Sequence, residues 1–350
     1  MNRIVFFNVL VFCTSIISLD VEASLLAAEP KEDQKAVIES YCQKIDKEFE
    51  RYSWGKSNCL DTKWIFVRHS IKGHPLIWAT FGIDPEVPSK EKDITMIMCG
   101  VHGDEITPPK FCFDIIKNAQ ANNQNYIQQN RIVIVAPLVN PDSFINANPS
   151  RTNAHGVDVN RNFPTKDWGA RALKVWKNVN NKDPRRYPGD KSFSEPETVF
   201  QVNLIKRYLP DKIISVHAPL TLLDYDGPIN SKQKFTDTIG NKANSLLIEM
   251  GHKANGYKIK DFPFFPGSLG NWAGNERKIP TYTLELPSSD PSKSQQYWEL
   301  FKEAIELAIT SNLRLPSEEV VEGDSKNSIK VGEKSPPAKS SISKKTTHPN

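Results

Sequence analysis

The sequence has no internal repeat and little excess charge. A repeat of about 20 to 50 residues would indicate a solenoid or a propeller, and no such period is present. The net charge of +4 is spread along the 350 residues, which argues against wholesale nucleic-acid binding and against an acidic solvating role. Hydrophobic residues make up 38% of the chain and charged residues 25%, as in globular proteins. We therefore expect one non-repetitive core and no nucleic-acid partner.

The apolar run at the N-terminus is too short for a membrane-spanning helix. It covers residues 4–19, whereas a spanning helix needs roughly 18 to 20 residues. The run follows Arg3 and precedes small residues at Ala23 and Ala27, which is typical of a cleavable secretory signal rather than a membrane anchor. We predict a signal peptide over residues 1–23 and no stable membrane insertion.

Cysteine is scarce. Four cysteines follow the signal, and their spacing matches no zinc-finger pattern. In an oxidising compartment Cys42 and Cys59 can pair across a short segment. Cys99 and Cys112 lie in apolar surroundings that are typical of buried thiols. The sequence leaves the pairing open.

The C-terminal stretch from Pro316 has no aromatic residue and few apolar ones. Ser, Lys, Glu and Pro dominate it, and such a composition cannot bury enough surface to order itself. After Glu333 its charged residues are Lys334, Lys339, Lys344 and Lys345. The tail therefore either binds an anionic wall or membrane surface or only solubilises the protein, and the composition favours the second role.

Short runs rich in β-branched residues alternate with longer amphipathic segments. The runs predicted as buried strands are residues 94–99, 131–138, 212–216 and 281–284. One helix is expected to start at Ser194, with Glu197 completing a capping box. Another is expected at Asp290, with Pro291 at its first position. This alternation predicts an α/β fold, a single domain with a mostly parallel or mixed twisted sheet flanked by helices.

Side chains that suit a metal ion follow two of these strands. His102 and Glu105, three residues apart, come directly after the first strand, and His217 ends the third. Open α/β sheets bind ligands at such strand ends. Zinc prefers imidazole and carboxylate ligands, and three protein ligands leave a fourth position for water, as in catalytic sites. An HxxE pair alone arises by chance in exposed loops, but together with His217 it predicts one catalytic Zn²⁺ per chain.

An acid embedded in an apolar strand is a second catalytic candidate. Glu285 ends the run that begins at Thr281, and burial of an unpaired glutamate is unfavourable. We therefore predict that Glu285 faces a polar cleft and acts as a base, the alternative being a salt-bridged structural acid. The histidines expected to be ordinary surface residues without partners are His69, His74, His252 and His348.

Arginine and asparagine gather between the two metal-binding segments. Arg151, Asn160 and Arg161 lie in one polar stretch, residues 150–163. A guanidinium holds a carboxylate through two parallel hydrogen bonds. The stretch therefore predicts an anion-binding surface, and the expected ligand is the terminal carboxylate of a peptide.

The order of these motifs resembles the zinc carboxypeptidases of the carboxypeptidase A type. The motifs are HxxE, Asn-Pro-Asp, Gly-Val-Asp-x-Asn-Arg-Asn-Phe, a strand-end His and a strand-end Glu, and the resemblance covers roughly residues 60–310. It implies a zinc carboxypeptidase-like fold in which His102, Glu105 and His217 bind zinc. It also implies that Glu285 acts first as general base and then as acid.

The same resemblance implies roles for the polar loop. Arg151 corresponds to the residue that stabilises the tetrahedral oxyanion. Asn160 and Arg161 correspond to the residues that hold the terminal carboxylate of the substrate, and Asp158 to the acid that orients His102.

In this family the segment before the catalytic glutamate, here residues 267–273, sets specificity. Near Gly270 this chain has neither the apolar residue that favours aromatic ends nor the acid that favours basic ends. The segments around His217 and Glu285 resemble those of bacterial murein peptide amidases, which cut the γ-D-glutamyl to meso-diaminopimelate bond of cell-wall peptides. Diaminopimelate carries an additional zwitterionic end, for which Gly270 and Asn271 are expected to provide a polar, roomy pocket.

The expected protein is thus a secreted, periplasmic zinc metallopeptidase acting on peptidoglycan stem peptides. One alternative is a general metallocarboxypeptidase for ordinary peptide C-termini, and another is an inactive module that binds peptide termini. The tyrosine that digestive members swing over the substrate has no clear match here, and Tyr257 is a candidate for it. The expected organisation is a signal peptide (1–23), an N-terminal segment (24–59), a zinc peptidase domain (60–315) and a disordered tail (316–350).

Overall fold

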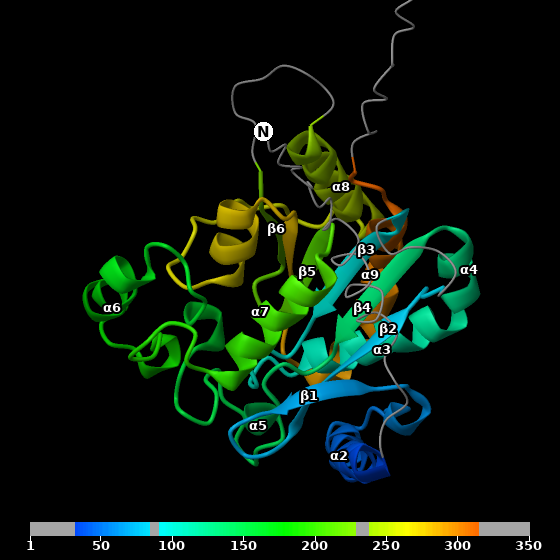
Figure 1. The fold of residues 1–350 in the computed structure, drawn as a ribbon, viewed down its shortest axis with the longest axis horizontal. Helices are drawn as coiled ribbons and strands as arrows, with labels where there is room; N and C mark the ends of the chain where they lie inside the picture. The colour runs from blue at the N-terminus through cyan, green and yellow to red at the C-terminus, as the bar shows by residue number, and fades with distance from the viewer. Residues whose placement is uncertain (1–31, 85–90, 229–237, 315–350) are drawn as a thin grey trace, which may run out of the picture. The chain divides into compact units, whose positions relative to one another are not determined.

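A seven-stranded sheet forms the centre of the protein in a computed structural model that describes residues 32–84, 91–228 and 238–314 (Figure 1). The strands are β1 (Ile65–His69), β2 (Pro75–Phe81), β3 (Asp93–Met98), β4 (Arg131–Ala136), β5 (Lys212–His217), β6 (Leu222–Asp226) and β7 (Thr281–Glu285). Their order across the sheet is β1-β2-β4-β3-β5-β7-β6. The neighbours among β4, β3, β5 and β7 run parallel, whereas β1 with β2, β2 with β4, and β6 with β7 pair antiparallel. The predicted mixed sheet is confirmed.

The strands predicted from sequence are β3, β4, β5 and β7, and all four are present within a few residues of the expected bounds. Every residue of β3 and of β5 is buried. Because both faces of these central strands are covered, their sequences are continuous β-branched or apolar runs rather than alternating ones.

Helices cover both faces of the sheet. The α-helices are α2 (Glu32–Arg51), α3 (Thr107–Ala121), α4 (Asn123–Gln128), α5 (Pro141–Phe144), α6 (Trp168–Asn178), α7 (Pro196–Tyr208), α8 (Ile239–Lys253) and α9 (Ser294–Thr310). The short helical turns are η1 (Cys59–Asp61), η3 (Val159–Arg161), η4 (Pro184–Arg186), η5 (Gly270–Asn275) and η6 (Pro291–Lys293). Helices α2, α3, α8 and α9 share one apolar core with one face of the sheet, while α7 and η5 pack on the other face (Figure 1).

The two helix starts predicted from sequence have different outcomes. Asp290 caps η6 as expected, its carboxylate accepting the Ser292 N–H, and α9 follows directly. The capping box at Ser194 is wrong. Helix α7 begins at Pro196, the Ser194 hydroxyl donates to Glu195, and the Glu197 carboxylate accepts a hydrogen bond from Asn153 instead. Glu197 is fully buried, and a buried carboxylate requires a hydrogen-bond partner, which Asn153 provides. Its side chain is therefore not available to cap the helix.

Both cysteine pairs form disulfides. Cys42 is bonded to Cys59, and Cys99 to Cys112. The expectation of buried thiols at Cys99 and Cys112 is therefore wrong. Cys99 follows β3 and Cys112 lies on α3, and the packing of this helix on the strand brings their Cα atoms to 6.2 Å, within bonding range.

One histidine expected on the surface is a packed structural residue. His74 Nδ1 lies 2.8 Å from Asp142 Oδ1, and the Asp142 carboxylate also accepts the Lys72 N–H. The Ser70 hydroxyl donates to the same carboxylate, so the turn between β1 and β2 is tied to α5. His69 and His252 are exposed, as expected.

Residues 32–59 join the main core, since Tyr41, Ile45 and Phe49 of α2 are buried in it. The predicted signal peptide and the predicted tail, with His348, lie outside the described residues. Within the described ranges, no helix has the length and apolar character that a membrane crossing requires.

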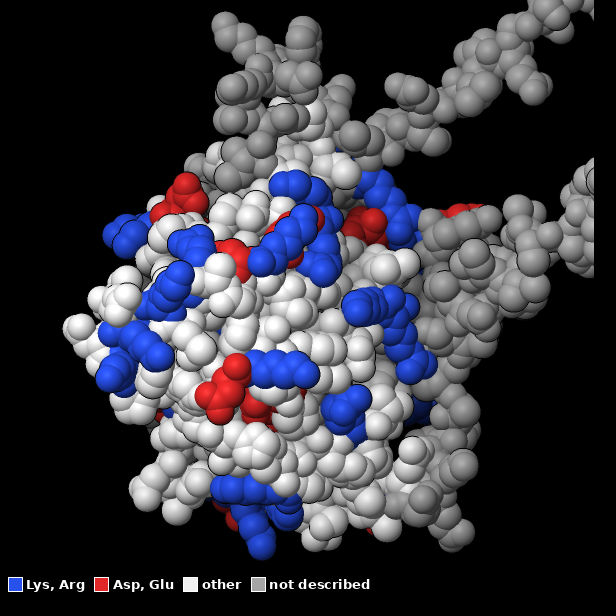
Figure 2. Space-filling model, turned by 60° about the vertical axis from the view of Figure 1, so that its left-hand side comes forward, with Lys and Arg blue, Asp and Glu red and all other residues white. Residues whose placement is uncertain are grey.

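Figure 2 shows one face of the molecule, on which Lys and Arg form separate groups with Asp or Glu beside several of them. The absence of a nucleic-acid partner stays a prediction.

Candidate metal centre

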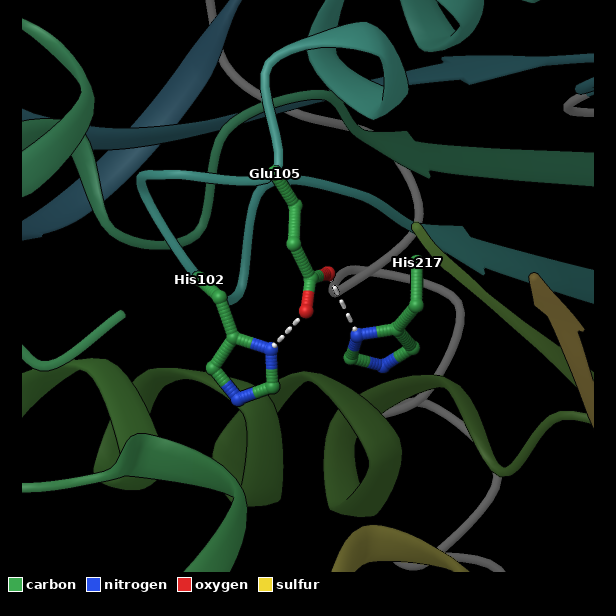
Figure 3. Close-up of side chains that lie close together, drawn as sticks. All are labelled: His102, Glu105 and His217. Carbon is green, nitrogen blue, oxygen red and sulfur yellow. Dashed lines mark hydrogen bonds and ion pairs between the residues drawn. The ribbon is translucent and has the colours of Figure 1, made fainter. Parts of the chain in front are cut away.

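Three potential metal ligands meet at the carboxyl ends of β3 and β5, which are neighbouring parallel strands (Figure 3). His102 lies in the turn after β3, Glu105 just before α3, and His217 is the last residue of β5. The Glu105 carboxylate lies between the two imidazoles, with Oε1 2.7 Å from His102 Nδ1 and Oε2 3.0 Å from His217 Nδ1. One donor atom of each residue lies within 4.8 Å of the others, and all three residues are buried. The structure thus brings the predicted ligands together.

The far nitrogen of each imidazole has its own polar partner. His102 Nε2 lies 3.1 Å from Asp158 Oδ1, and His217 Nε2 lies 2.9 Å from the Ser215 hydroxyl. Such contacts fix the ring orientation and leave each Nδ1 for a metal ion. Asp158 was predicted from the sequence, whereas Ser215 was missed, although it is two residues before His217 on the same strand face.

The electrostatics of the cluster favour a cation. Burial raises the pKa of the Glu105 carboxyl, but the charges and hydrogen bonds of His102 and His217 outweigh burial and hold that pKa below its usual range. Glu105 is therefore ionised at neutral pH. Two imidazole nitrogens and one buried carboxylate match the donor set of a catalytic zinc site.

Arg151 connects the two acids of the centre. Its Nε donates to Asp158 Oδ2 at 2.9 Å and its Nη1 to Glu105 Oε1 at 3.4 Å. Burial raises the pKa of the Asp158 carboxyl, yet Arg151 and His102 bring it well below the usual range. An ionised Asp158 therefore contacts both His102 and Arg151 and docks the loop of residues 150–163 beside the metal ligands.

Asn160 and Arg161 line the same cavity as the metal ligands. The Asn160 side-chain carbonyl accepts the Leu269 N–H at 2.8 Å, and the Arg161 guanidinium lies 4.7 Å from the ring centroid of Phe265. Burial lowers the pKa of Arg161 to about 10, opposed by Asp158 and assisted by the positive charge of Arg151. This part of the cavity is cationic, as an anion-binding role requires.

Glu285 is the last residue of β7 and lies opposite His217 in the β5–β7 register. Its carboxylate lines the cavity and accepts the Leu220 N–H at 3.3 Å. Burial raises the pKa of Glu285, with Glu105 adding to the increase and His217 opposing it. The predicted position beside a polar cleft is thus observed, and no salt bridge of Glu285 is present within the described ranges.

Gly270 and Asn271, the predicted pocket residues, differ in placement. Gly270 lines the cavity, which has a volume of about 290 Å³, and a Cβ there would overlap the Asp226 carboxylate. Asn271 is buried outside the lining, where its amide donates to Asp167 and to the Phe265 carbonyl. The geometry gives Asn271 a structural role in the loop rather than contact with a ligand.

Three other charged lining residues were missed from sequence. Asp224 and Asp226 of β6 and Arg186 of η4 all line the cavity. The signal for the two acids was in the sequence, because they alternate with apolar residues in Leu222–Asp226, as Glu285 does on β7. Tyr257 is not among the lining residues; its hydroxyl donates to the Glu285 carbonyl oxygen at 2.7 Å and its ring packs on Phe301.

Comparison with known proteins gives consistent matches. A zinc carboxypeptidase family model matches residues 61–304. Murein peptide amidase A of Escherichia coli K12 is 31% identical over 232 residues, which cover 65% of this chain and 83% of that protein. Murein peptide amidase A of Vibrio campbellii is 29% identical over 221 residues, which cover 62% and 77%. The solved structure of carboxypeptidase A from Helicoverpa armigera has a TM-score of 0.56 at 18% identity, covers 79% of this chain and 72% of its own, and shows the fold alone.

The family match spans most of the chain, and the buried His-Glu-His donor set fits the metal for which the family is named. This chain therefore belongs to the zinc carboxypeptidase family and is a hydrolytic metalloenzyme that uses zinc.

Proposed function

We propose that this enzyme is secreted, acts in the periplasm and hydrolyses the γ-D-glutamyl to meso-diaminopimelate bond of peptidoglycan stem peptides. The observation that carries the proposal is the composition of a single cavity, which holds the metal ligands, the arginines of the 150–163 loop and three further acids, Asp224, Asp226 and Glu285. The relatives named murein peptide amidase A support a cell-wall peptide as the substrate.

Glu285 is the group we assign to proton transfer. His102, Glu105 and His217 would hold the zinc ion, which when bound would supply a Lewis acid to polarise the scissile carbonyl and lower the pKa of water. Glu285 takes a proton from the attacking water and returns it to the leaving amine. Its pKa is raised by burial, which suits a group that must both accept and release a proton near neutral pH.

The arginines are assigned to the two negative charges of the reaction. Arg151 lies beside Glu105 and offers its guanidinium to the oxyanion that develops on the scissile carbonyl. Asn160 and Arg161 bind the carboxylate next to the scissile bond, for which the cationic part of the cavity is suited. Asp158 holds both Arg151 and His102 in place by direct contact.

Export is supported by the two disulfides. Disulfides form and persist in oxidising compartments and are rare in the cytosol. Cys42, Cys59, Cys99 and Cys112 are all buried in these bonds. Cell fractionation with intact-mass measurement tests this part of the proposal, and a full-length reduced protein in the cytoplasm would contradict it.

Mass spectrometry of digests tests the bond that is cut. Purified muropeptides and an unmodified peptide library are incubated with the wild-type enzyme and with Glu285→Gln, and both proteins are checked for zinc. We expect the wild type to release diaminopimelate from muropeptides and Glu285→Gln to release none. Release of C-terminal residues from the library without release of diaminopimelate would contradict the proposal and favour a general metallocarboxypeptidase.

A further inference from the structure

Strands β6 and β7 present polar side chains to the cavity at every second position. Leu223 and Tyr225 on β6, with Tyr282 and Leu284 on β7, belong to the apolar core shared with α8 and α9. Because side chains alternate along a strand, the other face carries the residues between them. These are Leu222, Asp224 and Asp226 on β6 and Thr281, Thr283 and Glu285 on β7, and all six line the cavity.

The register of the two strands places the acids at increasing depth. Leu222 pairs with Glu285, Asp224 with Thr283, and Asp226 with Thr281. Two residues along a strand span about 6.6 Å. Measured along the sheet, Asp224 is therefore about 7 Å and Asp226 about 13 Å from the row of Glu285, where the scissile bond has to lie.

Among the residues that the structure describes, no cation pairs with either acid. Asp224 is 4% exposed, and its Oδ1 accepts the N–H groups of Tyr225 and Phe262. Burial raises the pKa of Asp226 to about 7 and that of Asp224 to about 6. The charged side chains that add to these increases are acids, Asp261 among them, so these neighbours disfavour the ionised form as well.

The loop that sets specificity in the family is built around one of these acids. Gly270 and Gly274 of η5 lie against Asp226, and a Cβ at either position would overlap that residue. The specificity loop therefore carries no acid of its own, but it leaves the space in which an acid of β6 reaches the cavity. Carboxylates that are largely enclosed by protein without a cation to balance their charge destabilise a protein, and at a cavity they are typical of a ligand site.

We propose that Asp224 and Asp226 bind the ammonium group at the end of the side chain of the residue that is released. The proposal rests on the function proposed above and names what its pocket recognises. Diaminopimelate and lysine both carry a side-chain ammonium five bonds from Cα, which is on the order of 6 Å when extended. Counted from the scissile carbonyl carbon, the amide nitrogen and Cα add about 2.4 Å to this length, so the ammonium reaches about 8 to 9 Å, between the rows of Asp224 and Asp226. A side chain with the same carbon chain but no ammonium leaves both carboxylates without a cation and is rejected.

Three tripeptides that differ only in their last residue test the pocket. They are L-Ala-γ-D-Glu followed by meso-diaminopimelate, L-lysine or L-norleucine, and kcat/KM is measured for the wild type, Asp224→Asn and Asp226→Asn. Asp261→Asn is the matched control, because Asp261 is a nearby exposed acid outside the cavity lining. A charge-assisted hydrogen bond corresponds to about 10- to 100-fold in rate. We expect the two pocket variants to lose about that factor on the cationic peptides, with norleucine and the Asp261→Asn control changed less than about threefold.

Binding of the same peptides to a Glu285→Gln background, measured by calorimetry, gives a second readout that needs no turnover. Norleucine bound or cleaved as well as lysine, or an equal loss on all three peptides in Asp226→Asn, would overturn the pocket assignment. If ordinary peptides ending in lysine show the preference but γ-D-glutamyl peptides are not cleaved, the assignment holds and the proposed function fails. Zinc content and thermal midpoints of each variant confirm that it is folded.

Discussion

Replacement of Asp226 by asparagine is expected to stabilise the ligand-free enzyme at neutral pH. In the folded protein, burial and the neighbouring acids raise the pKa of Asp226 from 3.8 to about 7. The folded state therefore binds a proton more tightly than the unfolded state. The free energy of unfolding of the wild type falls as pH rises from about 4 to about 7, and this loss is complete above pH 7. Asparagine has no proton to lose, so Asp226→Asn lacks this term.

The size of the expected stabilisation follows from the shift in the pKa of Asp226. A change of about 3 pKa units corresponds to about 4 kcal/mol at about 1.4 kcal/mol per unit. Part of the shift comes from repulsion by Asp224 and by the exposed Asp261, and solvent screens that repulsion. We therefore expect Asp226→Asn to be more stable than the wild type by about 2 to 4 kcal/mol at pH 8, with the difference shrinking towards pH 4.

Urea unfolding of both proteins at several pH values between about 5 and 8 measures this difference. The gap between the two curves should widen by up to about 1.4 kcal/mol per pH unit until about pH 7 and then level off. Parallel curves, or a variant less stable than the wild type at pH 8, would refute the reasoning. Addition of lysine should narrow the gap at pH 8, because an ammonium bound to Asp226 favours its ionised form.

Three further predictions concern the metal, the carboxylate and the second disulfide. His217→Ala should lower zinc from one ion per chain to a small fraction in metal analysis, because it removes one of three ligand residues, and an unchanged zinc content would contradict the assignment. Arg161→Ala should raise KM for peptides with a free C-terminal carboxylate by about 10- to 100-fold, while C-terminally amidated peptides are equally poor substrates of both proteins; equal losses on both peptide types would exclude the assigned role. Cys99→Ser combined with Cys112→Ser should lower the free energy of unfolding by about 3 kcal/mol in denaturant titrations, given the short loop that the bond closes, and no change would show that the bond adds nothing.

The sequence predicts the parts of the fold that are buried on both faces. Central strands such as β5 are rich in β-branched residues, and the polar residues His102, His217 and Glu285 at or just after strand ends differ clearly from them. Strand β6 was not predicted, because two acids in five residues lower its apolar signal. Their alternation with apolar residues was a signal for a strand, but their place at the cavity depends on the pairing of β6 with β7, which joins segments separated by α8.

Tertiary contacts also explain why the predictions of free thiols at Cys99 and Cys112 and of a capping box at Ser194 were wrong. The Cys99–Cys112 bond depends on how α3 packs on β3, which the spacing of the two residues does not reveal. The Glu197 side chain is taken by Asn153, from a loop far away in the chain, so the local capping pattern fails. The metal ligands were predictable for the opposite reason, since strand order alone brings the ends of β3 and β5 together.

The pleat of β6 limits the distances from the metal centre at which the Asp224 and Asp226 pocket can present a charge. Cavity-facing side chains recur only at every second residue, so a charge on this strand can stand at the level of Leu222, Asp224 or Asp226 and nowhere between them unless the strand is bulged. Each shift moves the charge by about 6.6 Å, the length of an entire extended side chain rather than of one methylene. Moving an acid by one such position along β6 would therefore change the class of substrate side chain that the pocket binds. Finer adjustment of the depth of the pocket has to come from the wall that faces β6, at positions such as Gly270.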